Sequence, residues 1–142
     1  MKTSDQNSNL PTDDDKLHIA NTFLTALKNN DWDTMRTILA QDAAWTLPGT
    51  SVLSGVAAGA DAIIRRAQGL KSFGVKFELK HVLYGLHGVA LSLHNTSSRG
   101  SLILDEQVII ACQISDGKIV AMATYLSDVA GIEQFFVPGI ID

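Results

Sequence analysis

The segment from Ser101 to Ile114 constrains the fold most, because it alternates like a β-strand and is apolar on both faces. Successive side chains of a strand point to opposite sides, so each of these two faces needs a cover. Helices of the same chain can cover only one face. We therefore predict that a second copy of the chain covers the other face, as a two-fold homodimer. The first face carries Leu102, Leu104, Val108, Ile110, Cys112 and Ile114, and the second carries Ile103, Ile109 and Ala111.

The remaining periodicities predict three N-terminal helices, with a short strand between the second and the third, and then an antiparallel meander of four strands. The resulting fold class is α+β, with the helices on one face of the sheet. Thr12 and Asp15 have capping-box spacing, and Asp116-Gly117 is a hairpin signal. In chain order we expect helices over 12–30, 31–39 and 61–71, strands over 43–47, 75–83, 89–94, 101–114 and 118–127, a polar turn over 95–100, and a helical turn over 132–136.

The chain is long enough for one domain, which we place at 12–142 after a disordered tail at 1–11. With 11 basic and 15 acidic residues the formal charge is −4, and no basic stripe points to nucleic acid. No apolar run is long enough to cross a membrane, and no secretory signal is visible, so we expect a cytoplasmic protein. Because no His, Cys and acidic residues have metal-ligand spacing, we expect neither a metal nor another cofactor.

Several short motifs occur in a characteristic order along the chain. They are FLTAL at 23–27, NDWD at 30–33, DAAWTLPG at 42–49, SG at 54–55, GADAI at 59–63, RG at 99–100, DGKI at 116–119, and Asp128 ahead of FF at 135–136. In this order and spacing they resemble the nuclear transport factor 2-like superfamily, particularly its SnoaL-like branch of polyketide cyclase and ketosteroid isomerase relatives, over about residues 14–137. The resemblance implies a cone: a curved, mainly antiparallel sheet wrapped around about three helices and enclosing an apolar pocket. It also implies a dimer through the outer sheet face.

The resemblance also permits a test of ketosteroid isomerase activity, which uses a carboxylate base, a tyrosine and a protonated carboxylic acid. It places Phe23 at the tyrosine, Leu47 at the base, and Ile109 or Ile110 at the acid. None of these side chains moves a proton or donates a hydrogen bond, which argues against that activity. The Asp-Arg-Asp constellation of the related epoxide hydrolases has no counterpart that we can place.

Two residues remain as candidates for proton transfer. His81 lies between Leu79 and Leu83 on the apolar face of its predicted strand, so it is either a catalytic group or a core histidine bonded to backbone. Asp128 follows the last strand and is either a base that pairs with His81 or the cap of the next turn.

Further residues are candidates for contact with a ligand. Glu106 is chosen over Asp105 and Gln107, because those two share the face assigned to the dimer. Arg99 is interpreted as a surface ion-pairing residue, with contact to an acidic ligand as the alternative. The expected ligand-binding set is Phe23, Trp45, Leu47, Phe73, Glu106, Met122, Thr124 and Leu126.

Together these features predict a protein that binds a small hydrophobic or carbonyl-bearing molecule. If it is an enzyme, we expect a cofactor-independent isomerase, cyclase or hydratase that works by acid/base chemistry. The alternative is a non-catalytic ligand-binding or dimeric assembly module. A third interpretation is that the chain's own side chains fill the pocket and the dimer face carries the function.

Overall fold

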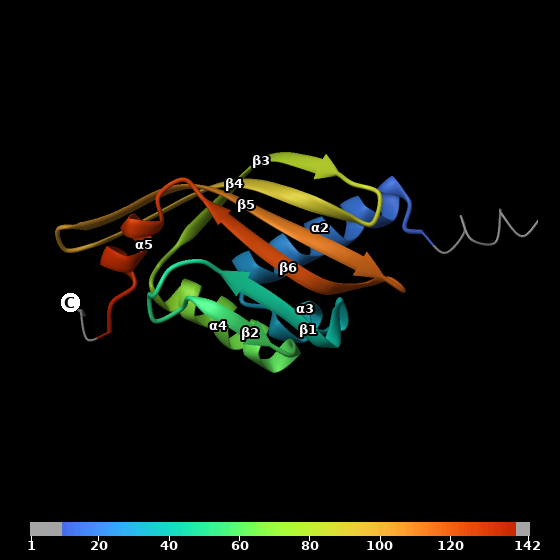
Figure 1. Cartoon of the computed structure of the whole chain (residues 1–142), viewed down its shortest axis with the longest axis horizontal. Coiled ribbons are helices and arrows are strands. Elements are labelled where there is room, and N and C mark those ends of the chain that lie inside the picture. The colour runs from blue at the N-terminus through green and yellow to red at the C-terminus, as the bar shows by residue number, and fades with distance from the viewer. Residues whose placement is uncertain (1–9, 139–142) are drawn as a thin grey trace, which may run out of the picture.

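A six-stranded curved sheet in the order β2-β1-β6-β5-β4-β3 forms the body of the protein (Figure 1). The computed structural model describes residues 10–138, so the predicted tail at 1–11 lies outside the described residues except for Leu10 and Pro11. All neighbouring strands are antiparallel except β1 and β6. The strands are β1 (Leu39–Leu47), β2 (Gly55–Ala58), β3 (Lys76–Tyr84), β4 (Gly88–Arg99), β5 (Leu102–Ser115) and β6 (Lys118–Leu126).

Helices α2 (Asp13–Asn29), α3 (Trp32–Thr37) and α4 (Ala60–Ser72) lie on one side of this sheet, and α5 (Val129–Phe135) lies at the end of the β4–β5 hairpin (Figure 1). The predicted capping box starts α2: the Thr12 hydroxyl accepts from the Asp15 N–H at 3.0 Å, and the Asp15 carboxylate accepts from the Thr12 N–H at 3.1 Å. Asp31 caps α3, as expected from the sequence. The predicted α+β fold is thus confirmed.

Three predicted boundaries are wrong. Strand β1 begins at Leu39, which we had placed in a helix, and β2 was not predicted. The polar segment at 95–100 is not a turn, because Asn95–Arg99 continue β4 and pair with Glu106–Leu102 of β5. The turn is confined to Gly100 and Ser101, and the Gly100 φ of +61° suits glycine. The composition of this segment suggested a turn, yet the inward-outward alternation of β4 continues through it, which brings Asn95 and Arg99 to the inner face.

The inner face of β5 is buried from Leu104 to Ile114, as its alternation predicted. On the outer face large apolar side chains stay exposed, with Ile103 67% and Tyr125 62% accessible. Across residues 10–138, the structure contains no helix that is both long and apolar enough to cross a membrane.

Candidate functional site

An enclosed cavity of about 30 Å³ lies between the inner sheet face and the helices. This volume is enough for one or two water molecules. The pocket expected from the sequence is therefore largely filled by the chain's own side chains. The cavity is lined by Leu27, Trp45, Leu47, Leu70, Val75, Phe77, Asn95, Leu104, Glu106, Val108, Ile110, Thr124, Leu126, Ile132 and Phe136.

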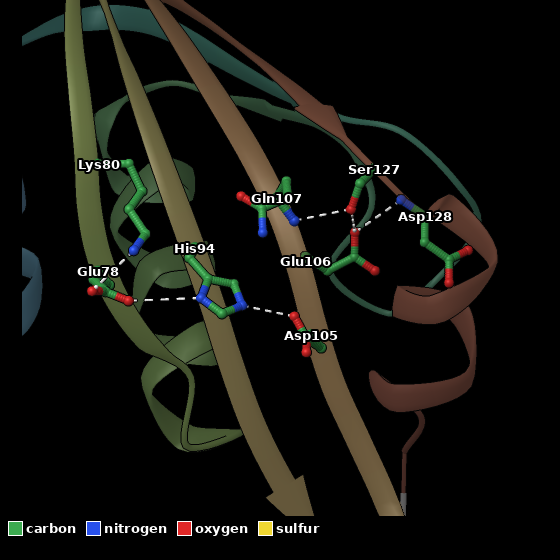
Figure 2. A network of polar contacts seen from close by, with 8 residues as sticks. All are labelled: Glu78, Lys80, His94, Asp105, Glu106, Gln107, Ser127 and Asp128. Carbon is green, nitrogen blue, oxygen red and sulfur yellow. Dashed lines mark hydrogen bonds and ion pairs between the residues drawn. The ribbon is translucent and has the colours of Figure 1, made fainter.

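Glu106 is the only ionisable residue of this lining. Its position on β5 directs the side chain inward, and the residue is 2% exposed. Figure 2 shows its carboxylate at the point where β6 meets α5: Oε1 accepts the Asp128 N–H at 3.0 Å and the Ser127 hydroxyl at 3.4 Å. Glu106 Oε2 lies 2.7 Å from the position that a Cβ on Gly131 would take, so the glycine leaves room for the carboxylate.

The surroundings of Glu106 favour its neutral form. Burial raises the pKa of this carboxyl above its ordinary value, and the nearby charges of Asp128 and Asp105 add to the rise. The hydrogen bonds from the Asp128 N–H and the Ser127 hydroxyl act in the opposite direction, since both stabilise the carboxylate. A carboxyl group with a raised pKa is both a stronger base when ionised and a proton donor over a wider pH range.

Asn95 stands directly opposite Glu106 on the neighbouring strand β4. It is 8% exposed, and within residues 10–138 its Oδ1 has no hydrogen-bond partner. A buried carboxamide oxygen without a donor is uncommon in folded proteins. Glu106 and Asn95 together form a polar spot in an otherwise apolar cavity. Sequence reasoning missed Asn95 because it placed the residue in a turn. The available signal was the alternation of Val89, Leu91 and Leu93, which places Asn95 on the same face when it is continued by one more step.

Trp45 forms a second polar contact in the cavity wall. Its indole N–H donates to the Thr124 hydroxyl at 2.6 Å, and both residues are buried. Phe23 packs edge-on against the Trp45 ring, with 6.0 Å between the ring centroids. The Arg66 guanidinium carbon lies 5.4 Å from the centre of the Trp45 ring, and the guanidinium donates a hydrogen bond to the Trp45 carbonyl. These contacts fix the indole in place, so it acts as a rigid wall.

The predicted ligand-binding residues occupy four places. Trp45, Leu47, Glu106, Thr124 and Leu126 line the cavity. Phe23 stands behind Trp45, and Phe73 packs on Phe135 and Phe136 at the α5 end. Met122 is buried and borders a groove on the outer side of the sheet.

The predicted position of His81 on the core face is wrong. The register of β3 against β4 shifts between Leu79 and His81, because Lys80 is an extra residue in the ladder. Such a bulge exchanges the two faces of the strand beyond it. Val82 consequently packs against the core, and His81 is exposed.

His81 and Asp128 do not meet. His81 pairs with Ser92, which pairs with Ile109, which pairs with Tyr125, so three strand spacings of about 4.8 Å separate β3 from β6. Asp128 caps α5 instead, accepting the Gly131 N–H at 3.0 Å. The capping alternative raised from the sequence is the one that the structure contains.

A second charged cluster lies on the outer face of the same strands (Figure 2). His94 Nε2 is 2.7 Å from Asp105 Oδ1, and its Nδ1 is 3.6 Å from Glu78 Oε1. Glu78 also pairs with Lys80 at 3.2 Å. Over residues 10–138 no group of three or more His, Cys, Asp and Glu side chains is placed to hold a metal ion.

Comparison with known proteins identifies the fold. No protein-family model and no curated protein matches the chain. Among solved structures, Bal32a from a soil-derived mobile gene cassette is 24% identical, with a TM-score of 0.81 over 87% of this chain and 97% of its own. A nuclear transport factor 2-like protein from Burkholderia xenovorans LB400 is 18% identical, with a TM-score of 0.73 over 88% and 98%. A protein described as a SnoaL-like polyketide cyclase from Jannaschia sp. CCS1 is 10% identical, with a TM-score of 0.70 over 87% and 92%. The fold is therefore that of the nuclear transport factor 2-like structures, SnoaL-like ones included, as the sequence motifs predicted.

Proposed function

We propose that this protein binds a small hydrophobic, carbonyl-bearing molecule in its inner cavity, with Glu106 as the acid/base group. The observation that carries this proposal is a buried carboxyl of raised pKa in an apolar cavity. Perturbed carboxyl groups in apolar sites are typical of proton-transfer enzymes. The similarity to a structure described as a polyketide cyclase agrees with a carbonyl-bearing ligand. His81 has no part in this proposal, and Asp128 contributes through its backbone N–H and its charge.

The chemistry needs no cofactor. Ionised Glu106 takes a proton from the carbon next to the ligand's carbonyl, and the electron pair moves onto the carbonyl oxygen as an enolate. Return of the proton from neutral Glu106 to the same carbon restores the ketone, which in heavy water is proton exchange. Where a carbon–carbon double bond is conjugated with the enolate, return of the proton to the far end of that double bond completes an isomerisation. Asn95 lies opposite Glu106, and its side-chain amide N–H donates to the ligand's oxygen.

A ligand needs more room than the present 30 Å³. The wall most suited to yield is the α5 end, because α5 is a single seven-residue helix that supplies Ile132 to the lining and is followed there by Phe136. The walls that the sheet forms are held in place by the hydrogen bonds between neighbouring strands. Ligand binding should thus displace α5 and leave the strands in register.

Two measurements test the proposal with 2-acetylnaphthalene and, as its matched control without a carbonyl, 2-ethylnaphthalene. Titration followed by NMR should move the Trp45 indole and Gly131 amide signals. In heavy water the protein should catalyse exchange of the ketone's methyl protons, and E106Q should lower that rate by about 10²-fold or more. E78Q, which removes an exposed carboxylate of the outer face, should keep it. Exchange that is unaffected by E106Q, or no shift at Trp45 under saturating ketone, would contradict the proposal.

Our second proposal is that the protein forms a homodimer through its outer sheet face, as the alternative of a dimeric assembly module requires. The outer face carries a groove of about 790 Å³ lined by small residues such as Ala90, Ala111 and Ala123, beside exposed Tyr125 and Leu83. Exposed apolar patches of this kind are typical of protein interfaces. Sedimentation at micromolar concentration should show a dimer, and Y125E should give a folded monomer. A wild-type monomer at that concentration would exclude it.

A further inference from the structure

Arg99 is the last residue of β4 and shares the inner face of that strand with Asn95. Its guanidinium carbon lies 4.5 Å from the centre of the Phe73 ring and 5.9 Å from that of Phe135. The residue is half-buried, and its Nη1 is buried without a hydrogen-bond partner in the described part of the chain. No carboxylate of residues 10–138 lies within ion-pair distance of it.

Within residues 10–138 the Arg99 guanidinium therefore lacks the acidic partner or carbonyl acceptors that a folded protein normally supplies to a partly buried cation. Contact with aromatic faces offsets part of the cost of burying a guanidinium. The charge itself is usually paired, because an unpaired buried charge costs several kcal/mol. Arg66, which is buried, shows the usual solution, since it donates to the carbonyls of Trp45 and Gly55. Half-buried Arg99 has no comparable acceptor within residues 10–138, and its planar fork is suited to a carboxylate.

The aromatic rings connect Arg99 to the cavity. Phe73 contacts both Phe135 and Phe136, with centroids 6.2 and 5.0 Å apart, and Phe136 lines the cavity itself. Along β4, Arg99 is four residues from Asn95, which at about 3.4 Å per residue is roughly 14 Å. An extended molecule of that length spans from the guanidinium, over the rings, to Glu106 and Asn95.

We propose that Arg99 is an anion-binding residue and that the ligand of this protein is a hydrophobic carboxylate. Its carboxylate pairs with Arg99, its apolar body replaces contacts among Phe73, Phe135 and Phe136, and its far end reaches the cavity. This inference rests on the proposed function, because it concerns the same ligand. It adds the charge of the ligand and its orientation.

The test uses 6-phenylhexanoate and its uncharged counterpart 6-phenylhexanamide, titrated calorimetrically at pH 7.5. Wild-type protein should bind the acid about tenfold or more tightly than the amide, since hydrogen bonds to charged groups are the stronger ones. R99Q should bring that ratio near one, mainly through weaker binding of the acid. R99K should keep part of the preference, because it keeps the charge and loses the fork.

The outcomes separate the two proposals. Equal binding of acid and amide by wild-type protein, or an unchanged ratio in R99Q, overturns the role of Arg99 and leaves cavity binding intact. Binding of neither probe overturns the role of Arg99 as well, and the 2-acetylnaphthalene titration then decides the cavity proposal by itself. If R99Q does not fold, the ratio in R99K and the decrease of the wild-type ratio with added salt decide the matter, because salt weakens an ion pair and leaves the apolar contacts shared by both probes.

Discussion

Asp105 and Glu106 are neighbours on one strand, yet they belong to two different polar regions of the molecule. Asp105 points outward and holds His94 in an exposed cluster with Glu78 and Lys80. Glu106 points inward, is 2% exposed and has only backbone and hydroxyl donors around it. The two neighbouring carboxyl groups of β5 thus have different roles: Asp105 makes a surface contact with His94, and Glu106 is a buried candidate for proton transfer.

The difference teaches that location, more than residue type, sets the chemistry of a carboxyl group. The hydrogen bond and charge of Lys80 lower the pKa of Glu78 on the outer face. On the inner face, burial raises the pKa of Glu106. Both are glutamates with the same ordinary pKa, and only their surroundings separate them.

Deleting the inner carboxyl should have the largest effect. E106A leaves the Asp128 N–H and the Ser127 hydroxyl without their acceptor and enlarges the cavity, so we expect a loss of about 1–3 kcal/mol. The matched variant D105A removes a surface pair and should cost at most about 0.5–1 kcal/mol. Urea unfolding measures both. Equal losses would show that the two faces do not differ as described.

The sequence predicted some of this comparison and missed the rest for physical reasons. The inward position of Glu106 follows from strict alternation along β5, which has no irregularity between Leu102 and Gln113. His81 was misplaced because the bulge at Lys80 leaves no sign in the hydrophobic pattern. A pattern of residue types also cannot give the size of a cavity, which depends on how the side chains pack.

The pH dependence of stability should be next in size. Because the folded state raises the pKa of Glu106, its contribution is fully present below the ordinary value of 4.5 and is lost as the pH rises through the folded-state value. Wild-type protein should therefore lose stability relative to E106Q, by about 1.4 kcal/mol for each pH unit between the two values. Unfolding curves of both proteins from pH 4 to 8 measure this. A difference that grows in the opposite direction would mean that hydrogen bonding outweighs burial.

The outer cluster should give the smallest effect, with the opposite sign. The pKa of Glu78 is lowered in the folded protein, so its contribution is present above pH 4.5 and is lost as the pH falls through the folded-state value. E78Q should hence be less stable than wild type near neutral pH and equal to it in acid. The side chain is 63% exposed, so salt screens the pair and the difference should disappear at 1 M NaCl. The Glu106 effect should persist at that salt concentration, because it arises from burial. A Glu78 effect that survives salt would place that cluster in a less solvated environment, as a dimer partner on the outer face would provide.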